Sequence, residues 1–404
     1  MVETDPGGHE EGAGRSDGSR PEGAERVQTA ISSRKRLPSR RMMTVLGSIA
    51  VAAIVLSAAW ILSGISRSQV TIVAIIPLSG PSSYLVEMEE AMYLTVEKLN
   101  RWGGINGVRL RLVVEDCESS HETAVAKLIE AEEKYHPLAV VTAVRGAAVP
   151  MSEVAEEKGV VLISVGATAE NLTAGKGWTF RYYSSPSYEA KNALDVLESL
   201  DAKSLGILCL DDVYGHSVRS RLTEALMATE VEVESYIFPA NATDFTDAVA
   251  TVAHKDAVFA VALRHQYSAI FLALNSSGYA GHVMGALEAS IPELWSMPEA
   301  QGCYVSAPIM YGSTTSVDKD FMEEFEQRYG EPLTHQGAIG SDVLKLIWSI
   351  LSDKEISREN LRNLLSMGFV HSGILGVVTL DQGVPNADIQ VYPAVIEGGE
   401  LRYL

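Results

Sequence analysis

The sequence has little cysteine, and the cysteines it has are scattered. Cys117, Cys209 and Cys303 stand far apart in a chain of 404 residues. Such spacing excludes a disulfide framework and a zinc site. Cys209 lies inside the apolar run SLGILCL and is expected to be buried in a core. The nine histidines show no paired metal-ligand spacing either. We therefore predict no metal and no cofactor.

An excess of positive charge is also missing. The formal net charge is −20, and nearly all of the acidic excess lies after residue 41. Because an acidic surface repels phosphate backbones, we exclude nucleic-acid binding. The sequence contains no Walker loop, no GxGxxG after a strand, no HExxH and no GxSxG. With no recognisable nucleophile beside a base, an enzyme is not expected.

One long uncharged run is present, at residues 42–63. It is long enough to cross a hydrocarbon core of roughly 30 Å. Five basic residues stand between 34 and 41, whereas only Arg67 follows the run closely. The positive-inside rule then leaves the N-terminal tail in the cytoplasm and places residues 65–404 outside the cell. We predict a disordered tail at 1–41, rich in Gly, Glu, Ser and Arg, and an uncleaved membrane anchor at 42–64. A long cleavable signal peptide is the alternative.

From Val70 onward, short apolar runs alternate with amphipathic segments, which is typical of an α/β fold with parallel sheets covered on both faces. Strands are predicted in two groups of four, at 71–76, 110–114, 138–144 and 159–165, and at 204–210, 231–238, 257–263 and 282–287. The later helices are expected near 188–200, 216–229, 244–254, 266–278, 317–329, 339–352 and 357–366, with final strands at 376–380 and 389–396. Two groups of strands predict two lobes with a cleft between them, one at 68–186 plus 307–366 and the other at 187–306 plus 367–404.

Three consecutive strand ends of the first lobe carry small and polar residues. They are the turns at 79–83, 145–148 and 166–168. Because the carboxyl ends of parallel strands share one edge of a sheet, we expect these turns to lie together where open α/β sheets bind ligands. The amides at 146–148 open a helix and are suited to an anion. Asp211 and Asp212 follow a strand of the second lobe and are interpreted as a helix cap or solvated turn.

Four of these segments resemble a known family in their residues. They are IPLSGP at 76–81, NRWGGINGVRLRLVVED at 100–116, ISVGATAENLT at 163–173 and DDVYGHS at 211–217. In this order, over residues 70–396, the chain resembles the type I periplasmic solute-binding proteins of the leucine/isoleucine/valine-binding class, which serve ABC transporters. The resemblance implies two Rossmann-like lobes with parallel sheets, joined by three crossovers and closing over a small ligand.

The resemblance also implies a site. The first lobe would hold a ligand α-carboxylate with the turns Arg145-Gly146-Ala147 and Gly166-Ala167-Thr168, and Tyr84 would supply an aromatic ring. The second lobe would contribute Tyr214 and, to receive the ligand ammonium, Glu288. The full set of expected ligand-binding residues is Ser79, Ser83, Tyr84, Arg145, Gly146, Ala147, Gly166, Ala167, Thr168, Tyr214, His265 and Glu288.

The third-strand turn departs from the family pattern. Relatives usually carry consecutive serines there, whereas this chain reads Arg-Gly-Ala-Ala. Arg145 either replaces the missing hydroxyl as a charged partner of a carboxylate or points to solvent. The family's turn disulfide is not expected in its usual form, since Cys117 would face Val144 or a neighbour.

The function expected from this resemblance is that of a membrane-anchored extracytoplasmic solute-binding protein. Its ligand would be a small polar molecule, with amino acids first and amides or short carboxylates next. Its partners would be an ABC permease and the ATPase of that permease. The alternative is the ligand-sensing ectodomain of a membrane receptor or signalling complex.

Overall fold

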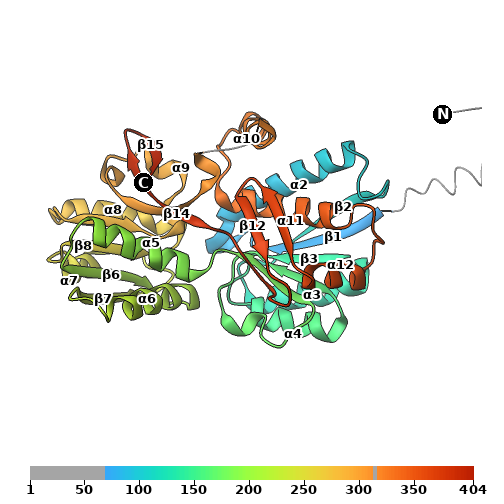
Figure 1. Ribbon diagram of the computed structural model, residues 1–404, viewed down its shortest axis with the longest axis horizontal. Helices are drawn as coiled ribbons and strands as arrows, with labels where there is room; N and C mark the ends of the chain where they lie inside the picture. The colour runs from blue at the N-terminus through green and yellow to red at the C-terminus, as the bar shows by residue number, and fades with distance from the viewer. Residues whose placement is uncertain (1–68, 313–315) are drawn as a thin grey trace, which may run out of the picture. The chain divides into compact units, whose positions relative to one another are not determined.

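Two β-sheets, each covered by helices on both faces, organise the residues that the computed structural model describes, 69–312 and 316–404 (Figure 1). The predicted tail at 1–41 and the predicted anchor at 42–64 lie outside the described residues. Among the helices of residues 69–312 and 316–404, none is both long and apolar enough to cross a membrane.

The first sheet has eight strands in the order β11-β12-β13-β5-β4-β3-β1-β2. Its strands are β1 (Gln69–Ile76), β2 (Arg109–Asp116), β3 (Ala139–Thr142), β4 (Val161–Ser164), β5 (Thr179–Tyr183), β11 (Phe369–Gly373), β12 (Gly376–Leu380) and β13 (Asn386–Asp388). The helices of this lobe are η1 (Gly80–Leu85), α2 (Val86–Arg101), α3 (His121–Tyr135), α4 (Ala148–Lys158), η2 (Glu170–Leu172), α10 (Ser316–Tyr329), α11 (His335–Ile350) and α12 (Arg358–Ser366).

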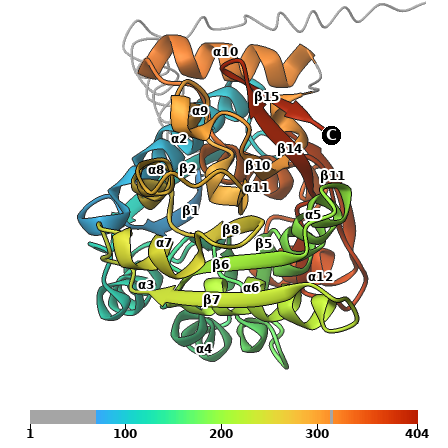
Figure 2. The same cartoon turned by 90° about the vertical axis from the view of Figure 1, so that its left-hand side faces the viewer.

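The second sheet has seven strands in the order β15-β14-β10-β9-β8-β6-β7 (Figure 2). Its strands are β6 (Ser204–Leu210), β7 (Glu232–Phe238), β8 (Ala257–Val261), β9 (His282–Gly285), β10 (Tyr304–Pro308), β14 (Val391–Glu397) and β15 (Glu400–Tyr403). The helices around it are α5 (Pro186–Ser199), α6 (Val213–Leu226), α7 (Thr246–Val252), η3 (Arg264–Gln266), α8 (Tyr267–Ser276), η4 (Leu287–Ala289), α9 (Pro292–Trp295), η5 (Pro298–Ala300) and η6 (Ile309–Tyr311).

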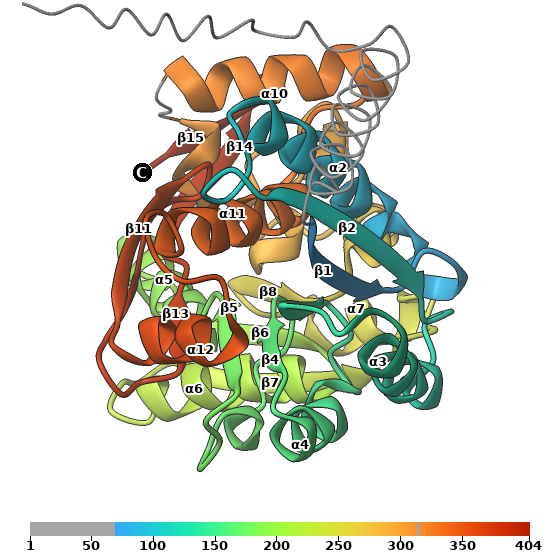
Figure 3. The same ribbon diagram turned by 90° about the vertical axis from the view of Figure 1, so that its right-hand side faces the viewer.

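Burial on both faces explains why the central strands are apolar without interruption. In β1, Ile72, Ala74 and Ile76 belong to the core that α2 and α11 cover. Val73 and Ile75 belong to the other core, under α3 and α4. Figure 3 shows α3 and α4 on the opposite side of β1 from α2 and α11. Successive side chains of a strand point to opposite faces, so a strand between two helical layers needs apolar residues at every position. Cys209 in β6 is fully buried, as predicted.

The sheets are mostly parallel but not wholly so, which corrects the prediction of parallel sheets. β11 pairs antiparallel with β12, and β12 pairs antiparallel with β13. In the second lobe, β14 pairs antiparallel with both β10 and β15. Very short turns join β11 to β12 and β14 to β15, and such connections can form only antiparallel pairs. The predicted strands and helices are all present, whereas β5, β10, β11, β13 and β15 were not predicted.

The chain passes between the two sheets after β5, after β10 and after β13. Hydrogen bonds tie the first and third passages together. The amide of Ile389 donates to the carbonyl of Tyr183 at 3.3 Å, and Asn192 Nδ2 donates to the carbonyl of Val391 at 3.0 Å. Few residues thus connect the lobes, which is the arrangement of a hinge.

The C-terminal segment divides between the lobes, whereas the sequence analysis assigned 367–404 to the second lobe. Strands β11, β12 and β13 continue the first sheet, and only β14 and β15 join the second. The buried carboxylate of Asp342 in α11 explains this placement. It accepts hydrogen bonds from the amides of Ile374 and Leu375, at 2.9 and 3.0 Å, in the turn between β11 and β12. These two turn amides have no partner in a neighbouring strand, so the Asp342 carboxylate satisfies them. The same contacts hold the β11–β12 hairpin on the first lobe.

We expect Asp342→Ala to lower the free energy of unfolding by about 3 kcal/mol, because it leaves two buried amides without an acceptor. Urea denaturation measures this loss, and hydrogen exchange should speed up first at Ile374 and Leu375. Asp381→Ala is the matched control, since Asp381 is exposed just after the same hairpin. Equal stability of the two variants would contradict the role of Asp342.

Candidate functional site

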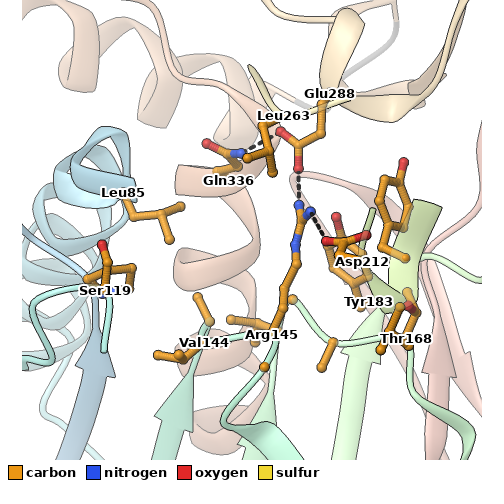
Figure 4. Close-up of a pocket in the computed structure, with 18 of the residues that line it drawn as sticks. Leu85, Ser119, Val144, Arg145, Thr168, Tyr183, Asp212, Leu263, Glu288 and Gln336 are labelled. Carbon is orange, nitrogen blue, oxygen red and sulfur yellow. Dashed lines mark hydrogen bonds and ion pairs between the residues drawn. The ribbon is translucent and has the colours of Figure 1, made fainter. Parts of the chain in front are cut away.

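A cavity of about 420 Å³ lies between the lobes, where strand ends of both sheets face each other (Figure 4). From the first lobe it is lined by the segments after β1, β2, β3 and β4, by the last residue of β5 and by α11. From the second lobe it is lined by the segments after β6, β7, β8 and β9. Most of its wall is apolar, from residues such as Leu85, Met88, Val165, Leu263 and Ile339. An apolar cavity with a few polar groups is the usual form of a small-molecule site.

An ion pair crosses this cavity from one lobe to the other. Arg145, in the turn after β3, donates from Nη2 to Oε1 of Glu288 in η4 at 2.7 Å. Its Nη1 lies 3.9 Å from Oδ2 of Asp212, and its guanidinium lies 5.0 Å from the centre of the Tyr214 ring. Figure 4 shows Arg145 reaching from the first lobe toward both acids. Because Glu288 is only 1% exposed, it requires a compensating cation.

A second set of contacts between the lobes surrounds Gln336 of α11. Gln336 Nε2 donates to Oε2 of Glu288 at 2.6 Å, so both oxygens of Glu288 have protein donors. Gln336 Oε1 also accepts from Arg264 Nη1 at 3.4 Å, and the same nitrogen lies 3.1 Å from Oε2 of Glu87 in α2. Beside them, burial lowers the pKa of His335 to about 4, which keeps this imidazole neutral at pH 7.

Behind the cavity, Glu189 of α5 holds two lining segments in place. Its Oε2 accepts from the hydroxyl of Tyr214 and from the amide of Leu287, each at 2.7 Å. Glu189 is fully buried, and this burial raises the pKa of its carboxyl to about 7, although both hydrogen bonds lower it. The nearby Glu288 carboxylate raises it further. Tyr214 is therefore fixed at the cavity by a group outside it.

The first-lobe end of the cavity offers donors to an anion. Helix α4 begins after Ala147 without a side-chain cap, but its first turn does not line the cavity, the Ala148 amide donates to the carbonyl of Arg145 at 3.4 Å, and Pro150 has no amide hydrogen. Thr168 is buried at the cavity wall, and its hydroxyl makes no hydrogen bond to any residue in 69–312 or 316–404. Gly146 also lines the wall, packed so closely on the His121 ring that a Cβ would collide with it. The Thr168 hydroxyl can therefore donate to a ligand carboxylate in the cavity.

The cavity brings together seven of the residues that sequence reasoning proposed. They are Arg145, Gly146, Gly166, Ala167, Thr168, Tyr214 and Glu288. The alternative that Arg145 points to solvent is wrong. Asp212 caps α6 as expected, since its Oδ1 accepts from the amide of Gly215 at 2.7 Å, and it also lines the cavity.

Four of the predicted residues do not line this cavity. Ser79 and Ser83 are exposed and do not line the cavity, because Asp116 at the end of β2 holds the first turn. Its carboxylate accepts from the Ser79 hydroxyl at 2.7 Å. Ala147 is buried in the core under α4, and His265 is exposed on η3. The side chain of Tyr84 lies outside the described residues.

Several lining residues were not predicted. Gln336 is separated from the strand ends in the sequence, and only the packing of α11 against α2 brings it to the cavity. Tyr183 ends β5, a strand that the sequence analysis missed. Ser119 and His121 follow the edge strand β2, and a polar strand end alone is a weak signal. Glu189, which lies behind the cavity, was not predicted either, because an acid in the first turn of a helix is too common to indicate a functional role.

The cysteines are free and buried within the described residues. Cys117 packs in the same apolar core as Val144, at the place where relatives are expected to carry a turn disulfide. Burial raises the pKa of the Cys117 thiol, which disfavours the reactive thiolate. Cys117 thus contributes to this turn by apolar packing.

Comparison with known proteins agrees with this architecture. A family model described as periplasmic binding protein matches residues 69–383. The Leu/Ile/Val-binding protein homolog 3 of Brucella melitensis is 27% identical over 247 residues, which cover 58% of this chain and 66% of the relative. This chain therefore spans just under two thirds of that relative, and less than half of the other curated proteins it matches.

Solved structures with the same fold include two that contain a ligand. The branched-chain amino acid transporter substrate-binding protein LivJ from Streptococcus pneumoniae, in complex with isoleucine, superposes with a TM-score of 0.74 at 21% identity and covers 83% of this chain and 98% of its own. A solute-binding protein of an ABC transporter from Rhodopseudomonas palustris BisB5, in complex with 3,4-dihydroxybenzoic acid, has a TM-score of 0.75 at 17% identity, with coverage of 83% and 96%.

We expect the protonation of Glu189 to make stability depend on pH. The pKa of about 7 in the folded protein lies above the ordinary value of 4.5, so the folded state binds the proton more tightly. Stability should therefore fall as the pH rises from about 4.5 through 7, and level off above. In Glu189→Gln, which stays neutral, this fall should shrink, so that its Tm exceeds that of the wild type by a few degrees at pH 8.

Thermal unfolding at several pH values between 5 and 8 measures the effect. Glu198→Gln serves as the control, because Glu198 is exposed near the end of the same helix. If both variants follow the wild-type pH profile, Glu189 does not titrate in this range.

Proposed function

The chain belongs to the periplasmic binding protein family, and from that premise we propose that it is a membrane-anchored, extracytoplasmic solute-binding protein that captures a small amino-acid-like ligand between its lobes for an ABC permease. One observation carries this proposal. The cavity of about 420 Å³ is made jointly by strand ends of both lobes, so a ligand in it touches both sides of a hinged cleft. A ligand that binds both lobes stabilises the closed form by its differential affinity for that form.

The first lobe supports recognition of a carboxylate. The hydroxyl of Thr168, buried and without a hydrogen bond to the described residues, lies on the first-lobe wall of the cavity. A buried hydroxyl without a partner costs free energy that a bound anion recovers. Arg145 and Thr168, two first-lobe donors, follow the neighbouring strands β3 and β4.

The apolar wall supports an aliphatic or aromatic body on the ligand. Leu85 and Met88 of the first lobe and Leu263 of the second line the same space. Burying such a body contributes about 25 cal/mol per Å² of apolar surface. A small molecule with one carboxylate and an apolar side chain therefore matches both ends of the cavity.

Delivery to a permease fits the contacts between the lobes. Arg145–Glu288 and Arg264–Glu87 each join one lobe to the other, so opening the cleft breaks both ion pairs. The open and closed forms thus present different surfaces to a membrane partner. The same change would serve a sensor, in which the partner is a signalling protein instead of a permease.

Ligand binding should raise the Tm of the full chain, purified in mild detergent, in a screen of amino acids, amides and small carboxylates. Thr168→Val should weaken binding of the active compound about tenfold, because it removes a donor to the carboxylate. Calorimetry measures both affinities, and Ser83→Ala, outside the cavity, should bind as the wild type does. A screen in which no compound of these classes raises the Tm would rule out the proposal.

Residues 42–64 should hold the protein in the membrane. After expression in a bacterial host, the full chain is expected in the membrane fraction and to resist extraction with alkaline carbonate, with residues 65–404 accessible to protease from outside. Deletion of 42–64 should release the protein from that fraction. Recovery of a shortened, soluble wild-type protein would instead indicate signal-peptide cleavage.

A further inference from the structure

Both oxygens of the acid that would receive a ligand ammonium already have protein donors. Oε1 of Glu288 accepts from Arg145 Nη2 at 2.7 Å, and Oε2 accepts from Gln336 Nε2 at 2.6 Å. Glu288 is nearly fully buried, so its charge is balanced by the guanidinium rather than by solvent. The positive group that a bound amino acid would bring to this acid is thus supplied by the protein itself.

We propose that Arg145 takes the place of the ligand ammonium, so that the protein selects small apolar carboxylates without an α-ammonium group over the matching amino acids. This inference rests on the proposed function, since it names the substrate class of that same site. The favoured class comprises 2-oxo acids and simple aliphatic or aromatic monocarboxylates.

The surroundings of Arg145 hold the guanidinium at this position. Its side chain is packed 5.0 Å from the ring of Tyr214, which Glu189 fixes by a 2.7 Å hydrogen bond. Stacking on an aromatic ring and an acid in front of it are the contacts that suit an arginine. Because a guanidinium does not lose its proton, the site keeps its positive charge at every physiological pH.

A ligand ammonium could pair with Glu288 only by breaking the ion pair between Glu288 and Arg145. Asp212, the other acid near Arg145, is a poor substitute partner for the displaced guanidinium. Asp212 Oδ2 lies 3.9 Å from Arg145 Nη1, too far for a direct hydrogen bond. Its carboxylate already caps α6 through the amide of Gly215. Separating one member of a buried ion pair costs free energy, and this cost would weaken the binding of an amino acid.

A ligand carboxylate, by contrast, has no conflict with Arg145. The arginine side chain enters the cavity from the first lobe, from the turn after β3, and Thr168 lines the cavity from the turn after the neighbouring strand β4. A carboxylate there gains from the Thr168 hydroxyl and from the nearby positive charge of Arg145. Arg145 therefore compensates for the serines that relatives are expected to carry in this turn.

Three ligands with the same carbon skeleton separate the two classes. They are L-leucine, 4-methyl-2-oxopentanoate and 4-methylpentanoate, titrated calorimetrically into the full chain in detergent. We expect the wild type to bind the better of the two ammonium-free acids at least tenfold more tightly than leucine. In Arg145→Ser, which frees Glu288 for an ammonium, the preference should shift toward leucine by at least tenfold.

Two further variants keep the test decisive. Arg264→Gln breaks the other ion pair between the lobes and should change all three affinities alike, leaving their ratio unchanged. Glu288→Gln removes the acid itself, and the preference for ammonium-free acids should persist in it even if Arg145→Ser does not fold. Loss of all binding to the ammonium-free acids in Glu288→Gln would overturn the inference.

The remaining outcomes distinguish this inference from the proposed function. Tighter binding of leucine by the wild type, or an unchanged ratio in Arg145→Ser, overturns the role of Arg145 and leaves the solute-binding function intact. The same holds if all three compounds fail while an amide or an ordinary amino acid binds. Failure of every compound in the wider screen overturns the proposed function itself.

Discussion

The ion pair between Arg145 and Glu288 is the contact around which the cleft is organised. It joins the carboxyl edge of one sheet to that of the other, and it brings a charged group from each lobe into a cavity with an apolar wall. Such a pair is stable only if its remaining hydrogen-bonding groups are satisfied. Gln336 completes the coordination of Glu288, and Tyr214, held by Glu189, packs against the guanidinium. Arg145, Glu288, Gln336, Tyr214 and Glu189 therefore form one connected network.

A second ion pair has the opposite polarity. Arg264 comes from the second lobe and Glu87 from the first, whereas Arg145 comes from the first lobe and Glu288 from the second. Two pairs of reversed sign restrict how the lobes meet, because a wrong register would place like charges together. Gln336 contacts members of both pairs, so the closed form couples the two sides of the cleft. The hinge formed by the first and third passages between the sheets leaves the lobes free to separate when these contacts break.

Much of the fold was predictable from the sequence, and the failures have identifiable causes. The strands β1, β3, β4, β6 and β8 are buried on both faces, so their apolar runs are unmistakable. Strand β5, with the sequence TFRYY, contains a buried arginine that interrupts the pattern. Strands β11, β13 and β15 are short, and their polar residues make them resemble loops. The assignment of β11–β13 to the first lobe depends on Asp342, whose contacts lie 32 and 33 residues away along the chain.

The sequence by itself determined the alternation of strands and helices, the two lobes and the strand ends that face the cavity, because hydrophobic periodicity and the geometry of parallel sheets are local properties. It also identified Arg145 and Glu288, but not that they pair. Only the tertiary structure decided that Ser79 in the turn after β1 hydrogen-bonds to Asp116 and that Gln336 lines the cavity. It also decided that the Arg145 guanidinium pairs with Glu288 of the second lobe. Each of those contacts joins residues of different elements or lobes. Which residues meet depends on their separation in space, and no local sequence pattern encodes that separation.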